Sequence, residues 1–158
     1  MKTYYKGAGY VFENMIEVAL RNNFPQLTIL NESQIQRIFG SYQGLNRKVN
    51  GVDLLCSDGI KFLAIQSKLV SSQPKTSSIE DFINTSLMIE QKIQKPLTKM
   101  FVTTFMPYFP GIQMCKNNNV QIIYHQYQNI LIENLISILK DGKPIHSLDV
   151  DIDGDIPM

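Results

Sequence analysis

Two apolar segments joined by an Asp-Gly pair restrict the fold of this chain more than any other feature. The segments are residues 52–56 (VDLLC) and 60–68 (IKFLAIQSK), and residues 57–59 (SDG) lie between them. An Asp-Gly pair between two such segments is a strong signal for a β-hairpin. The second segment is apolar at both alternating sets of positions up to residue 65, as expected of a central strand that is covered on both faces. The pattern therefore predicts a sheet with helices on either side.

Helical and extended patterns alternate through the rest of the chain. Apolar residues at helical spacing predict helices, and short apolar runs between turn residues predict strands. The helices are expected at residues 10–22, 31–39, 79–94 and 130–139, and the further strands at 27–30, 100–104 and 120–124. The polar, glycine-containing stretch 40–51 indicates an exposed loop. This order predicts an α/β fold with a mixed central sheet flanked by helices.

The length and charge of the chain indicate one domain and an acidic tail. A chain of 158 residues with 44% hydrophobic and 18% charged residues can bury a core without disulfides. We expect this domain to span residues 1–147 and a flexible acidic tail to span 148–158, where four aspartates lie. Residues 1–148 then carry 15 basic and 10 acidic side chains, a net charge of +5. Such a balance is compatible with a polyanionic partner but does not decide the function.

Membrane, secreted and zinc-binding classes find no support in the sequence. No apolar run approaches the roughly 18 residues of a membrane span. The first residues, MKTYYKGAGYVFE, lack the apolar stretch of a signal peptide, so we expect an intracellular protein without a membrane partner. Cys56 and Cys115 stand alone and form no metal-binding motif. We expect both to be reduced residues of the core.

The hairpin gathers polar groups at one of its ends. With a two-residue turn at 58–59, Asp53 pairs with Ala64, and strand alternation places Asp53, Gln66 and Lys68 on one face. A lysine in a central strand is costly to bury unless a carboxylate or a bound cation compensates its charge. The alternative is a strand that ends at Gln66 and lets Lys68 reach water, which requires no active site.

Several short motifs follow one another in a fixed order along the chain. They are Lys6-Gly7 with Phe12-Glu13, then Gly51-Val52-Asp53, then Gln66-Ser67-Lys68, and finally Phe101-Val102-Thr103-Thr104 before Val120-Gln121-Ile122-Ile123. In order and spacing they resemble the PD-(D/E)XK nuclease superfamily, in particular Mrr-type restriction endonucleases and archaeal-type Holliday junction resolvases. The resemblance covers roughly residues 6 to 125. It implies a restriction-endonuclease-like core.

The resemblance also implies a role for each residue of the site. Asp53 is the central metal ligand, and Gln66 is a second ligand through its amide oxygen, assisted by the backbone carbonyl of Ser67. Glu13 ligates a metal directly or through water, and Lys68 positions or activates the attacking water. Mg²⁺, with Mn²⁺ as a possible substitute, is the implied cofactor, because hard cations prefer oxygen ligands and lower the pKa of bound water.

The implied activity is that of a metal-dependent DNA endonuclease that hydrolyses phosphodiester bonds in DNA repair or recombination. The expected substrate is branched DNA or a modified duplex, and the expected assembly is a homodimer, because two strands need two sites. Arg47 and Lys48 lie in the loop that leads to Asp53. This position favours a role as phosphate contacts, and the alternative is a loop that the two residues merely keep soluble.

Two departures from the family pattern keep other functions open. Val52 replaces the proline of the family name, and Gln66 replaces a carboxylate with a neutral amide, which is a poorer Mg²⁺ ligand. Gln66 thus favours a non-catalytic protein of the same fold that binds nucleic acid or serves as an assembly subunit. Glu13 could instead belong to a solvated helix face with Glu17 and Arg21, at i, i+4 spacing. A third alternative is an unrelated α/β domain.

Overall fold

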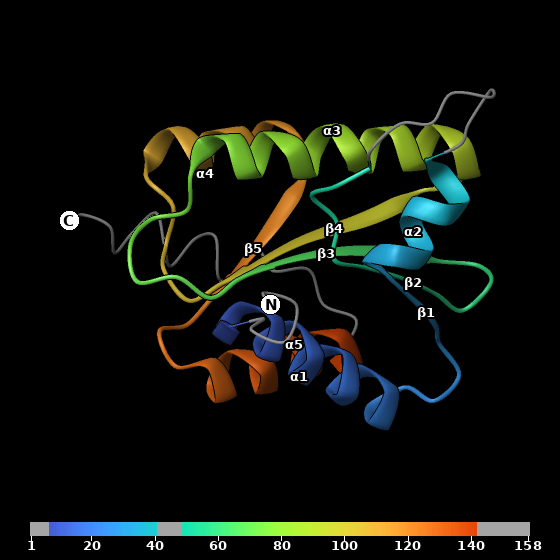
Figure 1. Cartoon of the computed structure of the whole chain (residues 1–158), viewed down its shortest axis with the longest axis horizontal. Coiled ribbons are helices and arrows are strands. Elements are labelled where there is room, and N and C mark those ends of the chain that lie inside the picture. Colours follow the sequence, from blue (N-terminus) through green and yellow to red (C-terminus); the bar gives the residue numbers. More distant parts are fainter. Residues whose placement is uncertain (1–6, 41–48, 142–158) are drawn as a thin grey trace.

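A five-stranded mixed sheet lies between two layers of helices in the computed structural model of the chain (Figure 1). The structure describes residues 7–40 and 49–141. The strands are β1 (Thr28–Asn31), β2 (Leu54–Ser57), β3 (Phe62–Lys68), β4 (Leu97–Thr103) and β5 (Val120–Tyr124). The helices are α1 (Gly7–Asn23), α2 (Glu32–Phe39), α3 (Thr76–Ile93), α4 (Phe109–Asn117) and α5 (Gln128–Asp141). The predicted α/β class, with a mixed sheet flanked by helices, is confirmed.

The strand order changes from antiparallel to parallel within one sheet. The strands lie in the order β1-β2-β3-β4-β5; β1 to β3 are antiparallel neighbours, and β3 to β5 are parallel neighbours. Parallel neighbours need a crossover connection, and α3 and α4 provide these crossovers. The carboxyl ends of β3, β4 and β5 therefore meet at one edge of the sheet, and α3, α4 and α5 begin beyond that edge.

Each face of the sheet has its own hydrophobic core. Helices α1 and α5 cover one face, and α2, α3 and α4 cover the other (Figure 1). On α1, Phe12 and Ile16 are fully buried at i, i+4 spacing. On the other face, the ring of Phe82 from α3 packs 6.2 Å from that of Phe101 in β4. Two covered faces explain why β3 is apolar on both sides.

The β2–β3 hairpin forms as predicted, but the predicted register is wrong by two residues. Ser57 pairs with Phe62, whereas a two-residue turn requires it to pair with Ile60. The carboxylate of Asp58 accepts the backbone N–H groups of Ile60 and Lys61, both at 2.8 Å. Aspartate often closes a turn in this way. These two hydrogen bonds stabilise a four-residue connection instead of the two-residue turn.

The corrected register moves Asp53 along the hairpin without changing the predicted face. A shift of two residues preserves the alternation of side chains, whereas a shift of one would reverse it. Asp53 no longer lies opposite Ala64; its backbone N–H donates to the carbonyl of Ile65 at 2.8 Å. The acid therefore lies beside Gln66 and Ser67.

Helix α4 was not predicted. Residues 107–111 contain Pro107, Pro110 and Gly111, which the sequence pattern treats as helix breakers. Proline is tolerated in the first turn of a helix, where its missing N–H needs no partner, and Pro110 lies there. A Cβ at position 111 would lie 2.8 Å from Cδ1 of Ile79 on α3. The glycine therefore allows α4 to pack closely against α3.

The structure addresses some of the remaining expectations, and others concern residues that it does not describe. Cys56 and Cys115 are buried thiols that form no disulfide, as predicted. Within the described ranges, no helix is long and apolar enough to cross a bilayer. Arg47, Lys48 and the predicted tail at 148–158 lie outside the described residues.

Candidate active site

The side chain of Asp53 lies where β2 and β3 separate. One carboxylate oxygen, Oδ2, accepts both the backbone N–H and the hydroxyl of Ser67, each at 2.9 Å. The residue is only 7% exposed. Asp53 therefore replaces the backbone partner that Ser67 would otherwise find in β2, and its position is fixed by two donors.

The amide of Gln66 holds the other side of the same carboxylate. The buried Gln66 side chain makes hydrogen bonds only with its nitrogen directed toward the carbonyl of Gly51, at 2.7 Å, and Oδ1 of Asp53, at 3.2 Å. In this orientation the amide nitrogen, and not the oxygen, faces Asp53. A metal ion shared by Asp53 and the oxygen of Gln66 would therefore require the amide to rotate by half a turn.

Gly51 allows the segment before Asp53 to approach α3. Its φ angle is +93°, in the region that favours glycine. A Cβ at this position would lie 2.8 Å from the backbone carbon of Asp81 and 3.0 Å from the nitrogen of Phe82. The glycine of the Gly51-Val52-Asp53 motif thus has a steric reason that is independent of any reaction.

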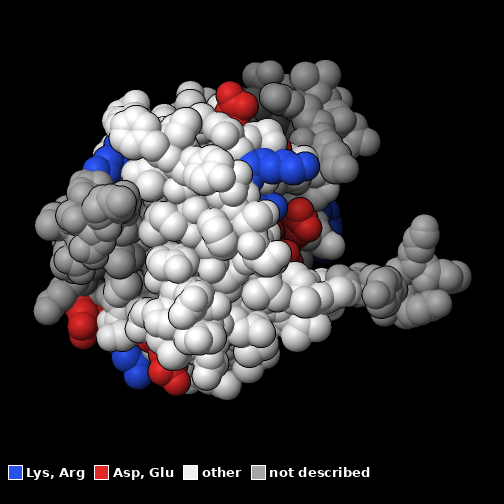
Figure 2. Space-filling model, turned by 90° about the vertical axis from the view of Figure 1, so that its left-hand side faces the viewer, with Lys and Arg blue, Asp and Glu red and all other residues white. Residues whose placement is uncertain are grey.

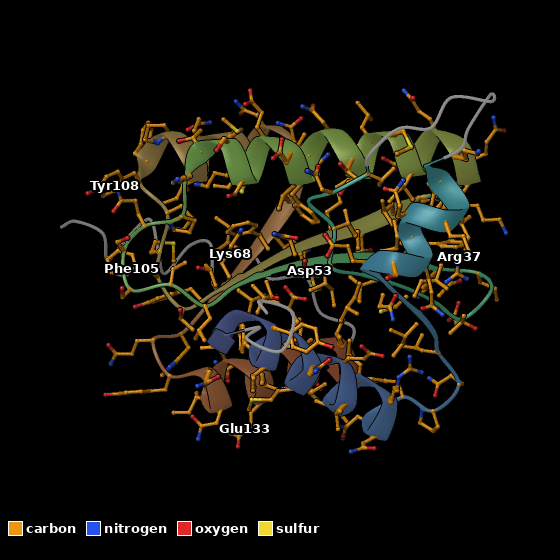
Figure 3. The ribbon with its side chains drawn as sticks, viewed as in Figure 1. Arg37, Asp53, Lys68, Phe105, Tyr108 and Glu133 are labelled. Atoms are coloured by element: carbon orange, nitrogen blue, oxygen red, sulfur yellow. The ribbon has the colours of Figure 1, made fainter. Side chains whose placement is uncertain are left out.

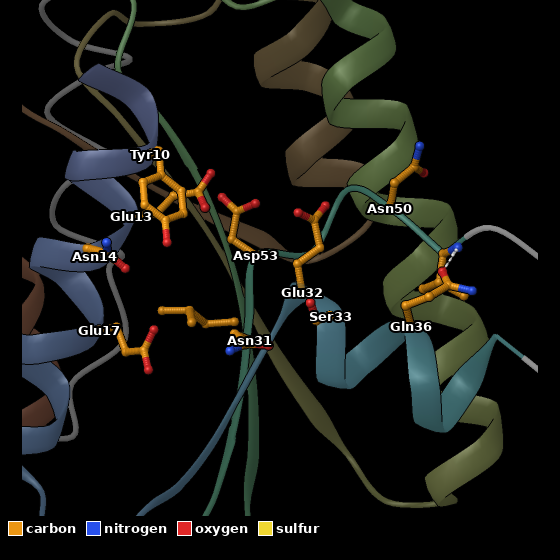
Figure 4. Close-up of a pocket in the computed structure, with 12 residues that line it drawn as sticks. Tyr10, Glu13, Asn14, Glu17, Asn31, Glu32, Ser33, Gln36, Asn50 and Asp53 are labelled. Carbon is orange, nitrogen blue, oxygen red and sulfur yellow. Dashed lines mark hydrogen bonds between the residues drawn. The ribbon is translucent and has the colours of Figure 1, made fainter. Parts of the chain in front are cut away.

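Three carboxylates from three different elements face one cavity. Glu13 comes from α1, Glu32 from the first turn of α2, and Asp53 from the start of the hairpin (Figure 4). Two adjoining cavities, of about 600 and 310 Å³, share these three acids and Asn50 among their lining residues. The smaller one is also lined by Gln66, Ser67 and Lys68. The cavity therefore brings together every predicted site residue that the structure describes.

The electrostatics of this cavity raise the pKa values of two acids. The pKa of Glu13 rises to about 7, mainly through burial and then through the negative charges of Asp53 and Glu32. The pKa of Asp53 rises to about 6, mainly through burial, although the hydrogen bonds from Ser67 lower it. Lys68 lowers both pKa values. One cation does not balance three carboxylates, so the site favours binding of protons or further cations.

Lys68 remains part of the sheet and is available to the cavity. Strand β3 extends through Lys68, which pairs with Thr103 of β4, so the alternative of a strand that ends at Gln66 is wrong. The side chain is half-buried. The ion pairs within the described ranges are Glu17–Arg21 and Glu90–Lys99, and neither includes Lys68.

The predicted i, i+4 stripe on α1 divides into two parts. Arg21 pairs with Glu17 at 2.8 Å on the surface of the helix. Glu13, one turn earlier, lines both cavities and is directed toward Asp53, whereas Glu17 lines only the larger cavity (Figure 4). The solvated-face alternative thus describes Glu17 and Arg21 but not Glu13.

Glu32 lines both cavities, although none of the sequence motifs includes it. Asn31 begins α2 with a capping box, in which its side chain accepts the N–H of Gln34 at 3.0 Å. An acid in the first turn of a helix is ordinary, so Glu32 alone carries no functional signal. Only the pairing of β1 with β2, which sets Asn31 opposite Leu54, brings Glu32 next to Asp53.

The oxygen atoms that line the cavity are of the type that hard cations prefer as ligands. Carboxylate, amide and backbone oxygens are the ligands that Mg²⁺ prefers, and the excess of negative charge also favours a cation. Within residues 7–40 and 49–141, however, no three His, Cys, Asp or Glu side chains are close enough to hold a metal ion together. A complete ligand set would therefore combine carboxylates with the Gln66 amide or the Ser67 carbonyl.

Comparison with protein-family models, curated proteins and solved structures finds no match for this chain. The functional proposal therefore depends on the motifs and on the geometry of the cavity.

Proposed function

We propose that this protein is a metal-dependent DNA endonuclease of the PD-(D/E)XK type with a restriction-endonuclease-like core. One observation carries the proposal: Asp53, Gln66, Ser67 and Lys68, which come from both strands of the hairpin, line one cavity together with Glu13. If the motifs form the active site of this superfamily, their residues must meet in space. Short motifs that match by accident need not meet.

In this proposal each residue has a role that its position permits. Asp53 and the backbone carbonyl of Ser67 hold Mg²⁺ or Mn²⁺, Gln66 joins them after its amide rotates, and Glu13 contributes directly or through water. The bound cation polarises the phosphate and lowers the pKa of the attacking water. Lys68 places a positive charge where negative charge develops, in a half-buried position where solvent screens it less.

The raised pKa values of the two acids support a cation site. Burial, and then the charges of the neighbouring acids, raise the pKa of Glu13 to about 7 and that of Asp53 to about 6, so both acids ionise less readily than in water. A bound cation supplies positive charge and favours the ionised form of both acids. We therefore expect Mg²⁺ to lower the pKa of Glu13 and of Asp53, as carbon-13 NMR of the labelled carboxyl groups can measure.

The substrate and assembly follow from the resemblance. We propose branched DNA or a modified duplex as the substrate, in a repair or recombination process. A homodimer is proposed because cleavage of both strands needs two sites.

Cleavage of a supercoiled plasmid and of a synthetic four-way junction tests the proposal. The wild type should cut in Mg²⁺ or Mn²⁺ but not in EDTA, and Asp53→Ala and Lys68→Ala should not cut. Asp58→Ala and Lys61→Ala are matched controls, because these two residues lie at the exposed, opposite end of the same hairpin. Unchanged DNA cleavage by folded Asp53→Ala and Lys68→Ala proteins would contradict the proposal.

A non-catalytic protein of the same fold is the second candidate, as a nucleic-acid-binding protein or an assembly subunit. The orientation of Gln66 favours it, because the amide nitrogen satisfies Asp53 and Gly51 without any metal. This candidate predicts salt-dependent DNA binding but no cleavage with any divalent metal.

A further inference from the structure

Four exposed aromatic rings lie on segments near the ends of β4 and β5, at the edge of the sheet where Lys68 ends β3. Phe105 follows β4, Tyr108 and Phe109 begin α4, and Tyr127 precedes α5; we call these four residues the aromatic edge. Phe105 is 38% exposed and the other three are between 57% and 71% exposed. Large apolar residues that cluster on a surface usually mark a binding site. In Figure 3 Phe105 and Tyr108 lie at the left-hand end of the molecule, and Lys68 lies between them and Asp53.

Hydrogen bonds at the ends of the parallel strands connect the aromatic edge to Lys68. The N–H of Thr104 donates to the carbonyl of Lys68 at 3.1 Å, and the N–H of His125 donates to the carbonyl of Thr103 at 3.4 Å. Lys68 pairs with Thr103, which in turn pairs with Tyr124. The segments that carry Phe105 and Tyr127 therefore continue directly from the strands beside the candidate site.

The backbone of the aromatic edge is held in place. The buried hydroxyl of Thr103 donates to the carbonyl of Phe105 at 2.8 Å and accepts its N–H at 3.2 Å. The carbonyl of Tyr108 accepts the N–H of Ile112 at 3.0 Å in the first turn of α4. Rings on a fixed backbone lose little conformational entropy when a ligand binds.

The charge of this face restricts what can bind to it. Figure 2 shows the left-hand side of the molecule in Figure 1, where the face is almost free of Lys, Arg, Asp and Glu and the charges gather at its margins. Double-stranded DNA presents phosphates outward and is held mainly by basic side chains, and the described residues of this face carry few of them. Unpaired nucleotides present their bases as well, and bases stack on aromatic rings irrespective of sequence.

We propose that the aromatic edge binds unpaired nucleotides, whose bases stack on its rings while the neighbouring phosphodiester reaches Lys68. This inference rests on the proposed nuclease function and specifies its substrate. The substrate is DNA with a single-stranded segment at the cut, such as a flap, a loop or an opened branch point. Uninterrupted duplex binds less tightly, because its stacked and paired bases cannot reach the rings.

Binding of fluorescein-labelled oligothymidylate and of a duplex of equal length, both in EDTA, tests the inference. The wild type should bind oligothymidylate more tightly than the duplex. Loss of one ring, in Tyr108→Ala or Phe109→Ala, should weaken binding of oligothymidylate by about tenfold, because a stacked base contributes roughly 1–3 kcal/mol. Tyr108→Trp should retain binding. Ile60→Ala is the matched control, since Ile60 is 75% exposed in the connection at the other end of the hairpin.

Two results would overturn the inference. One is equal binding of oligothymidylate by the wild type and by ring variants with unchanged thermal midpoints. The other is a fall in molar mass of the ring variants, measured by light scattering, while their DNA binding stays normal, because the aromatic edge is then a contact between two copies of the chain.

Failure of the inference is distinguishable from failure of the proposed function. If the rings are needed to bind oligothymidylate but no substrate is cleaved in Mg²⁺ or Mn²⁺, the proposed nuclease activity is wrong and nucleotide binding by the aromatic edge stands. Cleavage that is lost in Asp53→Ala and normal in Tyr108→Ala, on single-stranded and duplex substrates alike, retains the nuclease and rejects the aromatic edge.

Discussion

Two aspartates at opposite ends of one hairpin make similar hydrogen bonds but differ in pKa. Asp58, in the connection, accepts two backbone N–H groups at 2.8 Å and is exposed, and its pKa is lowered, mainly by those bonds. Asp53, at the open end, accepts the N–H and hydroxyl of Ser67 at 2.9 Å, yet its pKa rises to about 6. Burial and the charge of Glu32 outweigh the hydrogen bonds at Asp53.

This difference separates a structural aspartate from a candidate functional one. The bonds of Asp58 stabilise the turn, and its environment favours the charged form. Asp53 is kept in a place where its charge is unfavourable, beside two further acids. Groups with raised pKa values in a cavity are more frequent at functional sites than elsewhere, although structural networks also contain them. The comparison therefore predicts that changes at the two positions have opposite consequences.

The largest expected difference is in cleavage. Asp53→Asn keeps the shape of the side chain but removes the charge that holds a cation. Its rate of plasmid cleavage in Mg²⁺ should fall by at least about 100-fold, since losing a group behind a metal ligand alone costs roughly 10–100-fold. Asp58→Asn should cleave like the wild type. Equal cleavage rates for the two variants would contradict a catalytic role for Asp53 that Asp58 lacks.

Gln66→Glu tests for a metal site at the open end of the hairpin by adding a carboxylate there. Affinity for Mg²⁺, measured by calorimetry, should rise by about tenfold or more, because a carboxylate is a better ligand than an amide. The metal-free protein should become less stable at pH 8, because a further buried charge then faces Asp53 and the carbonyl of Gly51. Gln128→Glu, at an exposed position at the start of α5 and outside both cavities, is the control for an added charge. An unchanged Mg²⁺ affinity in Gln66→Glu contradicts a metal site at Gln66.

The pH dependence of stability should have opposite signs at the two ends. A carboxyl with a raised pKa in the folded state stabilises the fold below its unfolded pKa of 3.8, and this contribution disappears as the pH rises through about 6. Asp53→Asn removes the titrating group, so the stability of the metal-free variant relative to the wild type should rise by about 1–3 kcal/mol between pH 4 and pH 8. The hydrogen bond that the asparagine amide cannot accept lowers stability equally at both pH values.

Asp58 provides the opposite case. Its lowered pKa contributes stability above the ordinary aspartate pKa, and this stability is lost as the pH falls through the lowered value. Asp58→Asn should therefore be less stable than the wild type at neutral pH, and the difference should shrink in acid. Urea unfolding at pH 4 and pH 8 measures both variants, and an Asp53→Asn protein whose stability relative to the wild type does not rise from pH 4 to pH 8 would contradict the argument from burial.

The hairpin and the face that carries Asp53 could be predicted from sequence because strand alternation survives a register error of two residues. The register itself could not be predicted, because the side chain of Asp58 stabilises a longer connection than the Asp-Gly pair indicates. Helix α4 was missed because Gly111 suits a close contact with Ile79, which a local pattern does not contain.

Sequence analysis predicted the site residues that belong to motifs and missed those that do not. Asp53, Gln66 and Lys68 belong to the hairpin, so spacing along two strands was sufficient to bring them together. Glu32 reaches the cavity through the pairing of β1 with β2 and the turn into α2, which are long-range contacts without a local signature. The orientation of the Gln66 amide likewise depends on Gly51, and sequence does not specify it.

The smallest expected effect tests whether Glu32 belongs to the open end of the hairpin. Its negative charge raises the pKa values of Glu13 and Asp53, but burial is the larger cause at both residues. Glu32→Gln should therefore lower both pKa values by less than burial raises them, as carbon-13 NMR titration of the carboxyl groups would detect. Glu133→Gln, an exposed acid of α5 outside the cavity, should leave both titrations unchanged. If the two variants titrate alike, Glu32 is a helix-terminal acid without a role in the site, and the proposed cation site then depends on Glu13 and Asp53.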